Sequence, residues 1–227
     1  MNRKAQWLVA AMVCLMSTPQ IYGQMGIPSI RRPNIANIFH PVVGSGTAYE
    51  QTGSDGSKKS IEMSIVGSET IGTQLAFWME VGHVDRNSQQ MKYAKILLTP
   101  DDFAFHKIVF MMPNSTQPME MDMDAAKARG HREAVDKNLE KWHTVGTESV
   151  TVPAGTFSCE HWTKTDGKGD VWVSSKISPM GIVKSVDGNE TMVLTKVISD
   201  AKTHVVGTPM KFDPQMLQQM QMNRQKP

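Results

Sequence analysis

The sequence predicts a mainly β protein, built as one strongly curved antiparallel sheet that forms a half-open β-barrel. Short alternations of apolar and polar residues recur along the chain, and turns rich in glycine, proline and aspartate separate them, as in a β-meander. We expect roughly nine or ten strands from this pattern, and a single sheet of that length tends to curl. The clearest part of the meander runs from Thr144 to Lys184.

In this central stretch, residues that favour turns stand where a strand is expected to end. Val150 and Val152 alternate with polar residues, the period of a half-buried strand, and then meet Pro153-Ala154-Gly155. Because proline lacks an N–H and glycine takes positive φ readily, a turn is expected here. The next strand should place three side chains on one face: Phe157, Cys159 and His161.

Four further stretches alternate in the same way, and each predicts a strand with one apolar face. They are Ile61–Ile65, Leu75–Val81, Val171–Val173 and Met192–Ile198. Together these faces predict a large apolar surface on the concave side of the curved sheet.

The pattern changes to helical spacing in residues 124–143, where Val135, Leu139 and Trp142 recur every three or four positions. A curved sheet with a concave apolar face needs a plug or a ligand. This helical insertion is therefore expected to act as a lid or plug, although one helix is too small to cover all the apolar faces.

The N-terminus has the pattern of a secretory signal peptide: a short basic region, the apolar run Ala5–Met16 and a polar segment with Pro19. The run is shorter than the about 20 residues that span a bilayer. We expect cleavage after Gly23 and a periplasmic or secreted protein of the bacterial envelope. The expected organisation is a signal peptide (1–23), an extended leader (24–43), the β half-barrel (44–207) and a C-terminal helix and tail (208–227), in which Asp213-Pro214 starts the helix.

Charge and cysteine content narrow the class of protein. Of 24 Lys and Arg, Arg3 and Lys4 lie in the expected signal peptide, which leaves 22 basic against 22 acidic residues. A neutral mature chain gives no reason to expect a nucleic acid partner. Only Cys159 remains after cleavage, so no intramolecular disulfide can form and stability must come from a packed core.

Two corner motifs carry a family resemblance: Val-Pro-Ala-Gly-Thr-Phe at 152–157 and Pro-Met-Gly-Ile-Val-Lys at 179–184. With the signal peptide and the meander, they resemble uncharacterised bacterial envelope proteins of the lipoprotein-carrier-like half-barrel group, over residues 44–200. The resemblance implies a half-open barrel with an apolar cavity, in a group whose known members carry or sense lipids and lipoproteins. It implies no catalytic residue.

The leading interpretation is a secreted, non-enzymatic envelope protein that binds a lipid-like or other hydrophobic ligand on the concave face. Water in an apolar groove is unfavourable by about 25 cal/mol per Å², which gives such a ligand a driving force to enter. We expect a monomer without a cofactor, and an envelope protein is a second candidate partner. The residues expected to line the site are Ile61, Met63, Leu75, Phe77, Met79, Leu139, Trp142 and Trp172.

A methionine cluster supports the second interpretation, a Met-rich Cu(I)-binding envelope protein. Met119, Met121 and Met123 would place three thioethers on one side of an extended chain. Soft thioethers select Cu(I). The same residues also suit an irregular apolar lining, because methionine adapts to gaps in a core.

An enzyme is the third interpretation. Cys159 and His161 share a predicted strand face and could form a thiol–imidazole pair. A lone buried cysteine is, however, more often inert packing. The seven histidines lack zinc-ligand spacing, and the chain has no Gly-x-Ser-x-Gly elbow.

Overall fold

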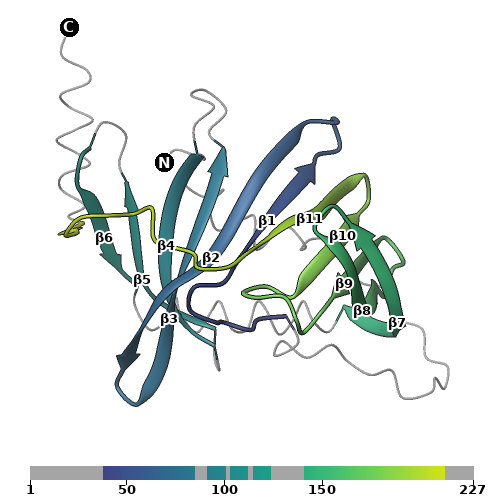
Figure 1. The fold of residues 1–227 in the computed structure, drawn as a ribbon, viewed down its shortest axis with the longest axis horizontal. Helices are drawn as coiled ribbons and strands as arrows, with labels where there is room; N and C mark the ends of the chain where they lie inside the picture. The colour runs from purple at the N-terminus through teal and green to yellow at the C-terminus, as the bar shows by residue number, and fades with distance from the viewer. Residues whose placement is uncertain (1–37, 85–90, 101–102, 112–114, 124–140, 213–227) are drawn as a thin grey trace, which may run out of the picture.

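The computed structural model describes residues 38–84, 91–100, 103–111, 115–123 and 141–212, and in these residues the chain forms twelve strands and no helix (Figure 1). The strands are β1 (Gly46–Thr52), β2 (Lys58–Ile71), β3 (Gln74–Val84), β4 (Met91–Thr99), β5 (Ala104–Met111), β6 (Pro118–Asp122), β7 (Trp142–Val152), β8 (Gly155–Lys164), β9 (Gly169–Val173), β10 (Ile182–Asp187), β11 (Glu190–Ile198) and β12 (Met210–Lys211). All of them belong to one sheet.

The sheet consists of two meanders joined in the middle. Its order is β12-β6-β5-β4-β3-β2-β1-β11-β10-β9-β8-β7, so β1 pairs with β11 where the two meanders meet. Neighbouring strands are antiparallel except for β12, which pairs parallel to β6. The prediction of a mainly β, antiparallel single sheet is confirmed. The prediction of a strongly curved half-barrel is wrong: the sheet is neither closed nor strongly curled, and it runs as one open order from β12 to β7.

The predicted turn at Pro153-Ala154-Gly155 is confirmed. Val152 pairs with Gly155 across the β7–β8 hairpin, so Pro153 and Ala154 form the loop. Gly155 has a φ of +132°, a value that residues with a side chain rarely adopt. The turn Asp187-Gly188-Asn189 connects β10 to β11, and Gly188 has a φ of +58°.

The predicted helical segments need correction where the structure describes them. Residues 124–140 and 213–227 lie outside the described residues, but Trp142 and His143 begin β7 and Met210-Lys211 form β12. The helical spacing of Trp142 was misleading, because this side chain is buried by cross-strand neighbours such as Trp162. Strand β6 was not among the predicted strands, although an extended chain was considered at Met119–Met123; the strand is short and lacks a β-branched residue.

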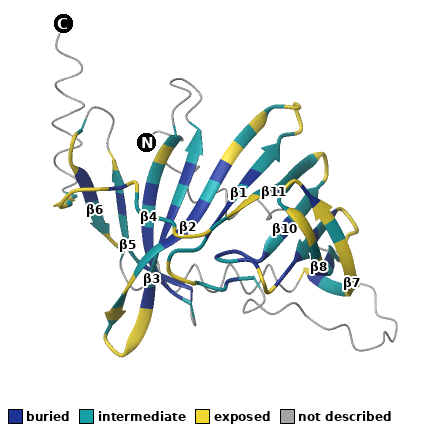
Figure 2. Cartoon of the chain, in the orientation of Figure 1, coloured by how far each residue is buried: buried dark blue, intermediate teal, exposed yellow. Residues whose placement is uncertain are grey.

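The main core is formed by alternate residues of the central strands, which share one face. Figure 2 shows that buried residues are concentrated in these strands. A smaller core lies on β7 to β9 and contains Trp142, Trp162, Val171 and Val173. The buried side chains that the central strands contribute to the main core include Tyr49, Ile61, Met63, Ile65, Met79, Ile96, Leu98 and Leu194.

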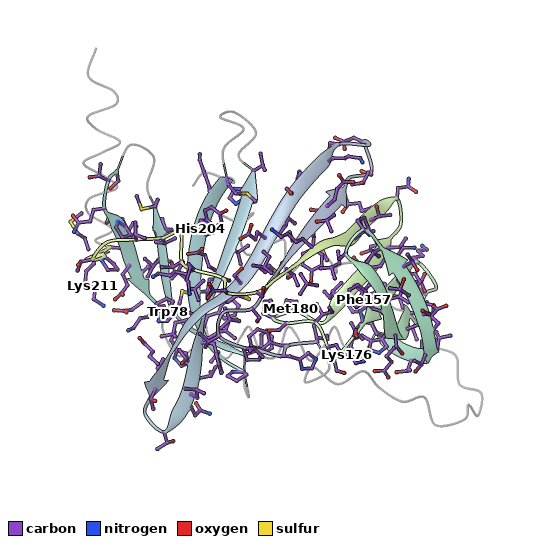
Figure 3. The ribbon with its side chains drawn as sticks, in the orientation of Figure 1. Trp78, Phe157, Lys176, Met180, His204 and Lys211 are labelled. Carbon is purple, nitrogen blue, oxygen red and sulfur yellow. The ribbon has the colours of Figure 1, made fainter. Side chains whose placement is uncertain are left out.

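Two segments outside the long strands pack against the main core, and we call residues 38–45 and 174–181 together the clasp. Phe39 and Met180 form an isolated antiparallel bridge, and the His40 N–H donates to the Pro179 carbonyl at 2.8 Å. Phe39, Ile177 and Met180 are all buried in the main core. Figure 3 places Met180 between the two halves of the sheet.

A strap, residues 199–209, crosses from β11 to β12 and passes over the strands between them (Figure 1). It is anchored on Glu80 of β3, whose side chain is 2% exposed and points away from the main core, because the preceding residue Met79 points into it. Glu80 accepts the N–H groups of His204 (2.9 Å) and Val205 (3.1 Å) and the hydroxyl of Thr203 (2.7 Å). One buried carboxylate therefore holds the strap in place.

Replacing Glu80 with alanine should release the strap, because the N–H groups of His204 and Val205 lose their acceptor. A hydrogen bond to a charged group contributes about 1.5–3 kcal/mol, so we expect the free energy of unfolding to fall by about 3 kcal/mol or more in urea denaturation. Glu50→Ala is the control, since it removes only an exposed ion pair with Lys58 and should cost less than about 1 kcal/mol. Equal losses in the two variants would refute the anchoring role.

Candidate functional site

The apolar face beneath the clasp is the candidate site, and it contains most of the residues predicted to line a ligand. Ile61 and Met63 on β2 and Met79 on β3 are buried in the main core. Phe77 and Trp172 are partly buried and pack against the same core. The structure therefore brings together five of the eight predicted lining residues.

The other three predicted residues do not join this face in the described structure. Leu75 lies beside the β2–β3 turn and is 52% exposed. Trp142 is buried in the smaller core with Trp162. Leu139 lies outside the described residues.

The Tyr49 hydroxyl connects the sheet to the clasp. Tyr49 is 1% exposed, and its hydroxyl donates to the carbonyls of Met180 (3.2 Å) and Ile182 (3.0 Å). Burial raises the pKa of Tyr49 far above its ordinary value, which keeps the hydroxyl protonated as a donor. Tyr49 thus brings a polar group to the apolar face, and that group binds Met180 of the cover.

A short polar seam closes the outer end of the clasp. The hydroxyls of Ser45 and Ser178 are in direct contact, and the Val42 N–H donates to the Ser178 hydroxyl at 3.2 Å. Inside this seam the cover is apolar, and the Phe39 ring packs edge-on against Phe103 with centroids 5.1 Å apart. The open groove expected from the sequence is therefore covered, in the described part of the chain, by the protein's own side chains.

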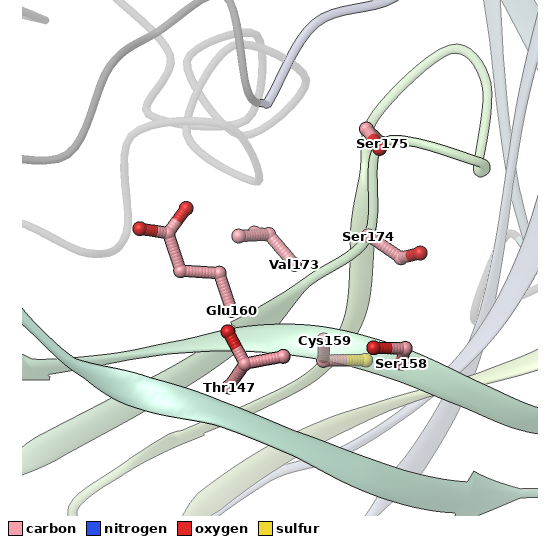
Figure 4. Close-up of a pocket in the computed structure, with 7 residues that line it drawn as sticks. All are labelled: Thr147, Ser158, Cys159, Glu160, Val173, Ser174 and Ser175. Atoms are coloured by element: carbon pink, nitrogen blue, oxygen red, sulfur yellow. The ribbon is translucent and has the colours of Figure 1, made fainter.

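A small cavity lies between β7, β8, the end of β9 and the first residues of the clasp segment 174–181 (Figure 4). Its volume is about 180 Å³, below the range of pockets that enclose drug-sized ligands. Hydroxyl groups and the carboxylate of Glu160 dominate its lining, so it does not suit an acyl chain. The lining residues are Thr147, Ser158, Cys159, Glu160, Val173, Ser174 and Ser175.

Cys159 and His161, the residues of the predicted thiol–imidazole pair, each bind other groups in the structure. The Cys159 thiol is buried and donates to the Phe157 carbonyl at 3.6 Å. The two His161 ring nitrogens face carboxylates, with Nε2 2.8 Å from Asp170 and Nδ1 3.2 Å from Glu148. Burial, and secondarily the charge of Glu148, raises the pKa of the Cys159 thiol to about 11. A thiol held protonated in this way is a poor nucleophile.

We predict that the Cys159 thiol of the folded protein reacts slowly with iodoacetamide at pH 8. A rise in pKa from 9.0 to about 11 lowers the thiolate fraction about a hundredfold, and burial slows the reaction further. The rate should increase as the pH rises towards 11, and denaturant should restore ordinary reactivity at pH 8. Rapid alkylation of the folded protein at pH 8 would contradict this description.

The three methionines of the copper interpretation lie on or next to β6. Met119 is buried, and Met123 packs against the main core. Met121 pairs across the strands with Ile108. These positions agree with core packing, and Cu(I) binding stays a prediction. In the described residues, His, Cys, Asp and Glu form no group of three or more that could hold a metal ion.

The cover itself was missed by sequence reasoning. Its residues Phe39 and Ile177 follow no periodic pattern, because they lie in connections rather than in strands. Met180 belongs to the corner motif Pro179–Lys184, which was noticed for its resemblance alone. A signal was available there, since a large apolar residue between proline and glycine at a corner has to be buried somewhere.

Comparisons with known proteins give a distant structural likeness. No protein-family model matches the chain, and no curated protein matches it. A predicted exported protein with a YmcC-like fold from Bacteroides fragilis is similar with a TM-score of 0.38 and 12% identity, over 70% of this chain and 98% of that one. A predicted lipoprotein from Parabacteroides distasonis is similar with a TM-score of 0.36 and 14% identity, over the same shares of the two chains.

Neither of these descriptions names a lipoprotein carrier. The resemblance to the carrier-like group therefore stays a prediction. The described residues also contain no helix that is long and apolar enough to cross a membrane.

Proposed function

We propose that the chain is an exported, non-enzymatic envelope protein that binds a lipid-like or other hydrophobic ligand between the apolar sheet face and the clasp. The observation that carries this proposal is the nature of the cover. In the described residues, the clasp over the face consists of two connecting segments joined by one isolated bridge, not of a second sheet. Export follows from the signal-peptide pattern at the N-terminus.

The clasp can separate from the sheet at a limited cost. Its contacts with the face include the buried side chains of Phe39, Ile177 and Met180 and the hydrogen bond from the Tyr49 hydroxyl to the Met180 carbonyl. Backbone hydrogen bonds to Ile65 fix residues 44–45 on β2, so the parts that can separate are residues 38–43 and 174–181. Exposing one such apolar side chain costs about 1.5–3 kcal/mol. The face below is contiguous and apolar, so an acyl chain can take over the contacts that the clasp gives up.

This cost defines the class of ligand. Each buried CH₂ group contributes about 0.8 kcal/mol, so roughly ten are needed to offset the exposure of three apolar side chains. The ligand is therefore a long acyl chain or an apolar molecule of similar size, and short-chain acids are too small. Met180 suits such a cover, because its flexible thioether can repack against different ligands.

The proposal predicts that a disulfide across the clasp seam blocks binding. The Ser45 and Ser178 hydroxyls touch, so cysteines at these two positions lie within reach of a disulfide. In a Cys159→Ala background, the oxidised Ser45→Cys/Ser178→Cys variant should bind a long-chain fluorescent fatty-acyl probe about tenfold or more weakly than the wild type, because the open state is removed. Reduction of the same sample should restore binding.

The reduced variant is the internal control, since it has the same sequence and the same side-chain volumes. The two single-cysteine variants control for the substitutions themselves and should bind the probe under both redox conditions. Two results would overturn the proposal: no binding of the probe by delipidated wild-type protein, or equal binding by the oxidised and reduced double variant.

A further inference from the structure

The two edges of the open sheet differ in how they are protected. The β12 edge has only two residues, and Lys211 there forms ion pairs with Glu120 (2.9 Å) and Asp122 (2.7 Å). Short edge strands and charged side chains are the usual protection against pairing with another chain. The opposite edge, β7, has eleven residues and pairs only with β8 in the described part of the chain.

Strand β7 lacks these protective devices over most of its length. It contains no proline and no lysine, and its one acidic residue is Glu148. The Glu148 carboxylate is held on its own sheet by the Trp172 indole N–H and by His161 Nδ1 at 3.2 Å. A register shift between Thr144 and Gly146 limits the regular part of the edge to residues 146–152.

The exposed side chains of this regular part form a neutral row. Thr147, Ser149 and Thr151 alternate along β7, point to the same face of the sheet and are exposed. Val150 and Val152 point to the opposite face with Glu148. A strand with exposed hydroxyl and β-branched side chains and an unpaired backbone is suited to pairing with another strand.

We propose that β7 pairs antiparallel with β7 of a second copy of this chain, around a two-fold axis at Ser149. In this register Thr147 lies opposite Thr151 of the second copy, and Ser149 lies opposite itself. Cross-strand Thr–Thr and Ser–Ser pairs are favourable, and Glu148 lies opposite a valine rather than another carboxylate. The dimer extends the sheet across the axis with the same patch on both copies.

Neighbouring registers are less favourable. A two-fold axis at Glu148 would place the two Glu148 carboxylates opposite each other, which is destabilising. An axis at Val150 would bring Pro153 into the ladder opposite Thr147, and proline cannot donate a hydrogen bond there. The axis at Ser149 lies in the middle of the regular part and avoids both contacts. The proposal replaces the monomer expected from the sequence and does not depend on ligand binding.

The test compares two double variants with the wild-type full chain by size-exclusion chromatography with light scattering. The wild type should have twice the mass of one chain. Thr147→Lys/Thr151→Lys places lysines opposite each other across the axis and should give a monomer. Thr147→Lys/Thr151→Glu places a lysine opposite a glutamate in this register and should retain the dimer.

Both positions are exposed, so circular dichroism and the thermal midpoint of each variant should stay close to those of the wild type. Amide hydrogen exchange of the wild type gives a second readout: the β7 amides that do not bond to β8 should lose protection on dilution, while those of β8 keep it. A wild-type monomer, a dimer in the Lys/Lys variant, a monomer in the Lys/Glu variant, or β7 protection independent of concentration would each overturn the proposal.

Discussion

The Tyr49 hydroxyl constrains the centre of the molecule. It lies on β1, the strand at which the two meanders join, and it is buried among aliphatic and thioether side chains. A buried hydroxyl without an acceptor is costly, so the chain has to bring acceptors to it. The carbonyls of Met180 and Ile182 are these acceptors. Because Met180 belongs to the clasp, its hydrogen bond to Tyr49 holds the clasp against the apolar face.

On the opposite side of the sheet, a connecting segment is also held by a buried polar group. Glu80 is buried on the face away from the main core, and the strap supplies its donors through Thr203, His204 and Val205. Each face of the open sheet is thus crossed by a connecting segment, and a buried polar group of a central strand holds that segment. The difference lies in strength: a buried carboxylate with several donors holds the strap more firmly than a neutral hydroxyl holds the clasp with one bond, to the Met180 carbonyl at 3.2 Å. The strap is therefore the fixed cover and the clasp the releasable one.

The local alternation of apolar and polar residues was sufficient to predict many of the strands and turns of the sheet. The alternation at Ile61–Ile65 and the turn at Pro153–Gly155 depend on nearest neighbours in the sequence, and both were predicted. Leu75 followed the same alternation but is exposed, because the strand extends beyond the core there. Periodicity reports which side chains share a face, and it does not report how far along the strand the core reaches.

Long-range features carried no local signal. The pairing of β1 with β11 and the parallel contact of β12 with β6 join residues far apart in the sequence. Glu80 was visible only as a polar residue in an apolar strand, and its donors come from the strap, more than a hundred residues later. The same limit applies to the candidate site: local alternation places Ile61, Met63 and Met79 on one apolar face, whereas nothing local indicates the cover.

Native-state hydrogen exchange tests most directly whether the clasp is a releasable cover. The amides of His40 and Gly181, whose hydrogen bonds close the clasp, should exchange through a local opening of low free energy. The amides in the middle of β2 and β3 should exchange only through global unfolding. If the clasp amides and the β2–β3 amides show the same opening free energy, the clasp is an inseparable part of the core and does not open.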